Sequence, residues 1–328
     1  MSTDSHPPST TTIPSEQPPT NDTDAISPPS APPRQATKTL RLRLYLYRIL
    51  LRASHRTDTF LTRLTTLLSS PTSTDALLCT LSYTLELLRS LLSQALLSRL
   101  NALSTATKTT PLVLPSETPI PSTTLLAQAV SSTKALAALL ADFRVFVRLW
   151  GLLGIYAWGK AVWKAPTPAA LSGKERVLRG LACAQILSCV AFQVLENGAY
   201  LASKGVLTGE GWAAREGAWW VWSSRFWAVH VGLEGVRLGV LWWASSKERG
   251  ALGEKGEVGD GEKEGKMERE GRRREDWVWW RDVVSNAAYF PMTMHWSTAT
   301  GLLSDAGVGA LGAVAGGALL VDAWRQTA

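Results

Sequence analysis

The sequence predicts an all-α integral membrane protein, with amphipathic helices in the first half followed by two to four hydrophobic membrane-associated helices. Three observations predict this class. Hydrophobic residues make up 45% of the 328 residues, which is high for a soluble protein. Apolar residues recur at helical spacing, and we find no neighbouring strand patterns that could pair. All fifteen Trp lie between Trp150 and Trp324, and Trp is enriched where membrane helices meet water.

The chain begins with a polar segment and then becomes amphipathic. Residues 1–37 are rich in Ser, Thr and Pro, which predicts a disordered tail without the apolar core of a signal peptide. Residues 38–143 are expected to form an amphipathic helical region at the membrane surface, whose side is given only by the resemblance described below. Its first helix, 40–52, places a basic surface stripe of Arg41, Arg48 and Arg52 within roughly 60° of arc. Two interpretations remain: a core helix with a solvated arginine edge, or a helix that lies on an anionic membrane.

The most regular amphipathic pattern follows a short helix over 56–68, which is expected to end before Pro71. Thr74 or Asp75 is the expected N-cap of the helix that begins there. Its leucines fall within roughly 100° of arc, with Ser, Glu and Arg opposite. The leucines that form this candidate membrane-inserting face are Leu77, Leu81, Leu85, Leu88, Leu92 and Leu96. Such a face either packs on neighbouring helices or enters one leaflet and bends the membrane.

A linker (104–124) and an Ala-rich helix (125–141) lead to the predicted membrane helices of 144–246. The segment 145–163 is a marginal span because Arg148 and Lys160 interrupt it, and 181–195 is short unless Tyr200 and Leu201 extend it. Charges inside such segments usually face protein or water. The candidate intramembrane polar residues are Glu196, His230, Glu234 and Arg237. We expect Glu234 to pair with His230 or Arg237 on its own helix, and Glu196 to meet Arg179, Arg225 or water.

Two stripes of small residues predict close helix packing and self-association. The first, on 219–244, consists of Ser224, Ala228, Gly232, Gly235 and Gly239. The second, on the C-terminal helix 302–321, consists of Gly309, Gly312 and Gly316. Between the two helices we expect a charged Gly-rich loop (247–276), and after it an interfacial segment that opens the last region, 277–328.

Residues for catalysis are scarce. The four His, at positions 6, 55, 230 and 295, lack metal-ligand spacing, and three Cys are too few for a disulfide framework. No nucleophile elbow, phosphate loop or dinucleotide fingerprint occurs. No basic face interleaved with aromatic residues suggests nucleic-acid binding. We therefore expect no enzyme, metal or cofactor, and we expect His295, the strongest lone candidate, to be structural.

Several segments in one order carry a resemblance. They read "RVFVRLWGLLGIYAW" (144–158), "FQVLENGAYLASKGVLTG" (192–209), "SSRFWAVHVGLEGVRL" (223–238), "NAAYFPMTMHWSTATGLLSD" (286–305) and "VGALGAVAGG" (308–317). Together they resemble the peroxisomal biogenesis factor 11 (peroxin-11) family, particularly its fungal C-type branch. In the first half, "TSTDALLCTLSYTLELLRSLL" (72–92) resembles the family's amphipathic helix, although Ala76 replaces the basic residue expected after Asp75.

The resemblance implies an integral protein of the peroxisomal membrane with a cytosolic N-terminal half. Family members elongate and help divide the organelle, insert amphipathic helices into the cytosolic leaflet and self-associate. The partners it implies are the lipid bilayer, further copies or family members, and a fission apparatus with a dynamin-related GTPase. The alternative function is a peroxisomal membrane channel for small metabolites, lined by His230, Glu234 and Arg237. The number and orientation of the spans stay open.

Overall fold

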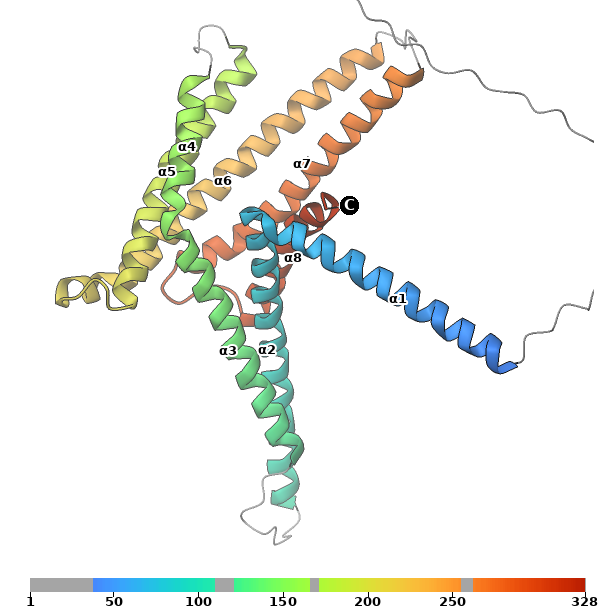
Figure 1. Cartoon of the computed structure of the whole chain (residues 1–328). Helices are drawn as coiled ribbons and strands as arrows, with labels where there is room; N and C mark the ends of the chain where they lie inside the picture. The colour runs from blue at the N-terminus through green and yellow to red at the C-terminus, as the bar shows by residue number, and fades with distance from the viewer. Residues whose placement is uncertain (1–37, 110–120, 166–170, 255–261, 328) are drawn as a thin grey trace, which may run out of the picture. The chain divides into compact units, whose positions relative to one another are not determined.

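The computed structural model describes residues 38–109, 121–165, 171–254 and 262–327, so the predicted tail lies outside the described residues. All regular structure within these ranges is helical, which confirms the all-α prediction (Figure 1). The elements are α1 (Lys38–Ser69), α2 (Pro71–Thr109), α3 (Pro121–Val147), the 3-10 turn η1 (Arg148–Trp150), α4 (Gly151–Lys164), α5 (Gly173–Ser203), α6 (Glu210–Glu254), α7 (Glu262–Trp296) and α8 (Asp305–Arg325).

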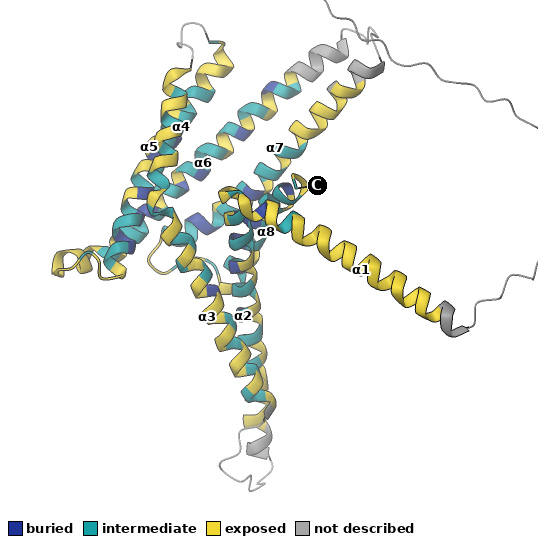
Figure 2. Cartoon of the chain, viewed as in Figure 1, coloured by how far each residue is buried: buried dark blue, intermediate teal, exposed yellow. Residues whose placement is uncertain are grey.

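The chain divides into two units within α1, the first ending at Arg56 and the second running from Thr57 to Ala328. In the first unit every side chain from Leu42 to Arg56 is exposed, as the yellow ribbon of Figure 2 shows. The two helices predicted over 40–52 and 56–68 are one continuous helix. The three residues between them include neither Gly nor Pro, so nothing in the sequence breaks the backbone hydrogen bonds.

The second unit is built from helix pairs. α2 packs against α3 and α8, α5 packs against α4 and α6, and α7 joins α6 to α8. Pro71 opens α2, where proline at the first helical position sacrifices no backbone hydrogen bond. The helix thus begins before Thr74 and Asp75, so the predicted N-cap is wrong.

The glycine stripe of α8 is the contact surface for α2. A Cβ added to Gly309 would lie 2.6 Å from the Leu87 backbone nitrogen, and one added to Gly316 would lie 2.8 Å from Thr80 Oγ1. Gly312, between them, faces the ring of Tyr83 at a distance that leaves no room for a Cβ. Residue numbers rise along α2 as they fall along α8, so the helices are antiparallel. This predicted stripe therefore packs, and it does so against a helix of the same chain.

α2 exposes two of the six leucines of the predicted apolar face, and the other four are half-buried. Ser82 and Ser90 are 7% and 8% exposed, whereas Leu81 and Leu88 are 44% and 43% exposed. A soluble amphipathic helix has the reverse arrangement. The hydroxyl of Thr84 donates to the Thr80 carbonyl oxygen at 2.6 Å, and such bonds satisfy polar groups within the helix itself.

Three of the described helices are long and apolar enough to cross a membrane: α2 over Pro71–Thr105, α5 and α8. α5 and α8 agree with the predicted hydrophobic segments, but α2 was expected to lie on the membrane surface. The marginal span 145–163 is divided by η1, and the 14 residues of α4 reach only about 21 Å. The apolar part of α6 contains Arg225, Glu234 and Arg237, and α6 is absent from this set.

The predicted charged loop 247–276 is wrong for its described part. α6 continues to Glu254 and α7 begins at Glu262, with residues 255–261 outside the description. Lys, Arg and Glu favour helix, and opposite charges four residues apart, such as Glu270 and Arg274, stabilise it further. The predicted interfacial segment, which begins at residue 277, continues α7 as far as Trp296.

Candidate functional site

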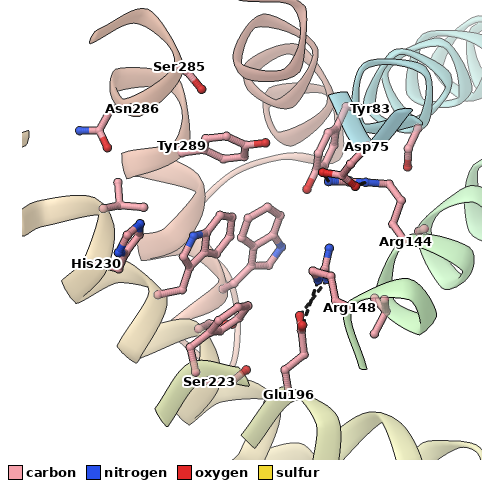
Figure 3. Close-up of a pocket in the computed structure, with 18 of the residues that line it drawn as sticks. Asp75, Tyr83, Arg144, Arg148, Glu196, Ser223, His230, Ser285, Asn286 and Tyr289 are labelled. Atoms are coloured by element: carbon pink, nitrogen blue, oxygen red, sulfur yellow. Dashed lines mark hydrogen bonds and ion pairs between the residues drawn. The ribbon is translucent and has the colours of Figure 1, made fainter. Parts of the chain in front are cut away.

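A cavity of about 810 Å³ lies within the second unit, bordered by side chains of α2, α3, η1, α5, α6, α7 and α8 (Figure 3). Its lining combines charged, hydroxyl and aromatic groups. Two arginines, Arg144 and Arg148, reach it from the end of α3 and from η1. The polar lining residues come from α2, α3, η1, α5, α6 and α7, whereas α8 contributes only Leu319.

Arg148 and Glu196 form a two-bond ion pair between η1 and α5. Nε and Nη2 of Arg148 donate to the two carboxylate oxygens at 2.9 and 2.8 Å, and Glu196 is 5% exposed. Asn197, next in sequence, donates to the Leu149 carbonyl oxygen at 2.8 Å and thereby fixes η1 against α5. A buried carboxylate requires such a partner, because an unpaired charge is very costly away from water.

The predicted partners of Glu196 are therefore wrong. Arg179 donates to the Ala165 carbonyl oxygen at 3.3 Å, and Arg225 donates to the Ser297 carbonyl oxygen at 3.2 Å. The sequence held a usable signal: Arg148 interrupts one apolar segment and Glu196 interrupts another, so two isolated opposite charges needed partners.

The second ion pair of the cavity joins α3 to α2. Arg144 donates to the Asp75 carboxylate, at 2.9 Å from Nε and 3.5 Å from Nη2. Arg144 has a side chain only 12% exposed, whereas that of Asp75 is 55% exposed. Nearby, the Cys79 sulfur and the Tyr289 hydroxyl are 3.2 Å apart. Sequence reasoning missed Arg144, Tyr83 and Tyr289 as lining residues, because none of them interrupts a periodic pattern.

Of the three polar residues predicted to interact on α6, Glu234 and Arg237 are in contact, but His230 has a different partner. Glu234 accepts hydrogen bonds from Nε of Arg237 at 2.8 Å and from the Gln185 amide of α5 at 2.9 Å. The predicted Glu234–Arg237 pair is thus confirmed, whereas the nearest polar partner of His230 is the Cys189 sulfur at 3.3 Å. His230 and Glu234 line the large cavity, but Arg237 lines a different one with residues of α7.

An aromatic wall, defined as Tyr83, Phe192, Trp220, Trp227, Tyr289 and Trp296, borders the same cavity. The Trp227 ring lies nearly parallel to that of Trp296, with centroids 5.5 Å apart. Tyr289 meets Trp227 edge-on at 5.3 Å, and Tyr83 lies 6.4 Å from Trp296. Rings from four helices therefore line the same cavity as the two arginines.

The remaining predicted residues fall elsewhere. On α6, Ala228 is buried and Gly235 lies beside the Asn286 amide, but a Cβ on Gly232 or Gly239 would meet nothing within 4 Å. Leu77, Leu85, Leu92 and Leu96 are half-buried on α2, and Ser224 lines the cavity. Arg48 and Arg52 are exposed on α1, while the Arg41 side chain lies outside the described residues.

His295 closes the turn between α7 and α8. Its Nδ1 accepts hydrogen bonds from the backbone N–H groups of Leu302 and Leu303, both at 2.8 Å. Gly301, with φ of +70°, packs against the imidazole ring, a conformation and a closeness that favour glycine. These contacts give His295 a structural task. Among the described residues no three His, Cys, Asp or Glu side chains are grouped to hold a metal ion.

No family model, curated protein or solved structure matches this chain. The resemblance to the peroxin-11 family therefore depends on the sequence segments quoted above.

Proposed function

We propose that this chain is a peroxisomal membrane protein that promotes elongation, proliferation and fission of the organelle. The observation that carries the proposal is the outward leucine face of α2, since Leu81 and Leu88 are exposed while Ser82 and Ser90 are buried. An apolar exterior with a polar interior suits a helix bundle surrounded by lipid. The sequence resemblance supplies the organelle and the process.

The antiparallel contact of α2 with α8 indicates that both helices belong in the same environment. α8 is apolar enough to cross a bilayer, and the part of α2 from Thr80 to Leu87 lies along it. α2 therefore belongs in the bilayer beside α8, with its leucines toward lipid. If α2 spans the bilayer, it cannot be the helix that enters only one leaflet. We therefore assign that role to the exposed first unit of α1.

The first unit has the composition that such insertion requires. Residues 38–56 contain six Lys or Arg and no acidic residue. Large apolar side chains are exposed among them, for example Leu46 at 50% and Leu50 at 66%. A helix of this kind binds an anionic surface through its cations and spreads the lipid head groups with its apolar side chains, which expands one leaflet and curves the membrane.

The proposed partners follow from the resemblance: anionic lipid on the cytosolic leaflet, further copies of the chain, and fission machinery with a dynamin-related GTPase. On α6, the stretch around Gly232 and Gly239 has free space above it in the single chain. This is where a second copy would meet the protein in the proposed self-association.

The test is imaging of the tagged full chain together with a peroxisomal marker. We expect both signals to coincide, organelles to elongate and multiply at raised expression, and fewer, larger organelles in cells that lack the protein. Leu46→Glu with Leu50→Glu should abolish elongation without preventing insertion into the membrane, because a carboxylate opposes burial of that face among lipid. Leu46→Met with Leu50→Met keeps the face apolar and serves as the matched control. Placement on another membrane, or organelles of unaltered number and shape, would contradict the proposal.

The alternative function, a channel for small metabolites, is favoured by the polar cavity alone. Glu234 reaches that cavity, so Glu234→Gln should change the conductance of purified protein in planar bilayers. A flat trace from the wild-type protein would dismiss the channel.

A further inference from the structure

The large cavity is lined by two kinds of recognition group. Arg144 and Arg148 supply guanidinium groups (Figure 3), and the aromatic wall, in which Tyr83 lies beside Arg144, supplies ring faces and edges. Guanidinium groups bind phosphate, and aromatic rings attract ammonium groups. A volume of about 810 Å³ falls within the ordinary range for small-molecule sites.

The charged groups of the lining compensate one another, so the cavity disfavours a ligand that carries a net charge. The lining contains four carboxylates and two guanidinium groups. Asp75 pairs with Arg144 and Glu196 with Arg148, while Glu234 and Asp282 pair with the arginines behind them, Arg237 and Arg281. Every carboxylate of the lining thus has its cation. A ligand with net charge would bring an uncompensated charge into a partly buried site, whereas an electrically neutral zwitterion would not.

Arg148 has capacity left for a ligand. Glu196 occupies its Nε and Nη2, and among the described residues Nη1 has no hydrogen-bond partner. The Arg148 side chain is 35% exposed, against 7% for that of Glu196, so the arginine is the more accessible member of the pair. A phosphate oxygen can therefore bind Nη1 without breaking the ion pair.

We propose that this cavity binds a zwitterion that joins a phosphate to an ammonium group, the chemistry of phosphocholine and of phosphatidylcholine head groups. The phosphate lies at Arg148, and the ammonium group lies against the aromatic wall beside Trp296. The inference does not depend on the membrane-remodelling function, because it concerns a cavity that such remodelling does not use.

The test measures binding to the purified full chain in dodecyl maltoside, whose sugar head group carries no charge. Tryptophan fluorescence and the thermal midpoint are followed as dihexanoyl-phosphatidylcholine is added below its micelle concentration. We expect saturable binding, and binding about tenfold weaker for dihexanoyl-phosphatidylglycerol, which has the phosphate but no ammonium group. Equal binding of the two lipids would overturn the proposal.

Free phosphocholine distinguishes the source of the ligand. If it competes with the lipid, the head group suffices and a soluble zwitterion occupies the site. If the lipid alone binds, with its preference over phosphatidylglycerol intact, the head group is recognised as part of a membrane lipid. Both results support the site.

Paired variants test the residues. Arg148→Gln with Glu196→Gln removes both charges together and should weaken phosphatidylcholine binding about tenfold. The matched control, Arg89→Gln with Asp305→Asn, removes an interhelical pair with a 2.6 Å contact outside the cavity and should bind as the wild type does. Wild-type affinity in the Arg148/Glu196 variant would contradict the assignment of the phosphate to Arg148.

If the Arg148/Glu196 variant shows no cooperative unfolding, Trp296→Leu replaces it, with Trp280→Leu as the control. Trp280 is 58% exposed and lies outside the cavity lining. Loss of the phosphatidylcholine preference in the Trp296 variant alone supports the site, and retention of that preference overturns it.

Discussion

At the scale of single residues, polar pairs hold this helix bundle together. Arg148–Glu196 joins η1 to α5, Arg144–Asp75 joins α3 to α2, and Arg281–Asp322 joins α7 to α8. In lipid, apolar side chains gain nothing by leaving water, so close packing and interhelical hydrogen bonds must hold helices together. Two of the charges that interrupt the apolar segments, Arg148 and Glu196, form such a contact between helices, whereas Glu234 and Arg237 pair within α6.

Gly312 offers a direct test of close packing between α2 and α8. Gly312→Ala should lower the free energy of unfolding by about 1–3 kcal/mol, because the added methyl group meets the ring of Tyr83. Gly317→Ala, where a Cβ meets nothing within 4 Å, should leave stability unchanged or raise it by up to about 1 kcal/mol. Denaturant unfolding in detergent measures both, and equal effects at the two positions would contradict the packing.

The ion pair between Asp142 and Lys204 predicts a dependence of stability on pH. Their closest atoms are 2.5 Å apart, and the hydrogen bond from Lys204 lowers the pKa of Asp142 below its ordinary 3.8. The Asp142 carboxylate therefore contributes stability above pH 3.8, and this contribution disappears as pH falls through the lowered pKa. The same hydrogen bond raises the pKa of Lys204 above 10.5, so on the alkaline side the contribution is lost as pH rises beyond that value.

Asp142→Asn should remove the acid-side part of this dependence and should leave stability at neutral pH slightly lower. Thermal unfolding of wild type and variant from pH 7 to pH 3 tests it. The difference between the two midpoints should shrink as the pH approaches 3. A difference that is constant over this range would show that the ion pair adds nothing to stability.

Sequence reasoning predicted residue contacts within one helix better than contacts between helices. Glu234 and Arg237 stand three residues apart on α6, so helical geometry alone brings them together. Arg148 and Glu196 are 48 residues apart, and their contact depends on η1, which turns Arg148 toward α5. No periodic pattern indicates such a turn.

At the scale of helices, the leucine pattern of α2 was visible in the sequence but its orientation was not. A leucine stripe with Ser and Thr opposite is compatible with a protein core or with lipid. The buried Ser82 and Ser90 and the close approach of α8 at Gly309 and Gly316 show which side of α2 faces protein. The proposed function assigns lipid to the opposite, leucine side. Only the partner helix carries that information.

The first unit of α1 should bind anionic lipid through its arginines. Arg43→Gln with Arg48→Gln and Arg52→Gln should weaken this binding by about 3 kcal/mol, since each cation at an anionic surface contributes about 1 kcal/mol. Hydrogen exchange of residues 42–55 in proteoliposomes measures it. We expect protection with anionic lipid that decreases in the variant and at high salt.

A triple variant of α7 controls for the general loss of positive charge. Arg272→Gln, Arg273→Gln and Arg274→Gln remove the same charge from an exposed part of α7 and should leave the exchange of residues 42–55 unchanged. Equal protection of wild type and α1 variant at every lipid composition would contradict adsorption by arginine.

At the scale of the whole molecule, composition and periodicity were sufficient to predict an all-α chain and the approximate position of most helices. They did not predict that the described part of 247–276 is helical, because alternating charges are typical of a solvated helix as well as of a loop. They also missed the cavity, whose lining is assembled from seven elements that lie far apart in the sequence. Such a site exists only once the helices are packed.

We propose that the exposed leucines of α2 lie in lipid, and spin labelling is the direct test. With the three native cysteines replaced by alanine, single cysteines at position 81 or 88 would carry the label, and a label at position 270 on α7 would be the aqueous control. In proteoliposomes we predict that the labels on α2 collide readily with oxygen and hardly with a water-soluble nickel chelate, and that the label on α7 does the opposite. Labels at 81 and 88 that collide with the nickel chelate as freely as the label at 270 would place that face in water and contradict the account.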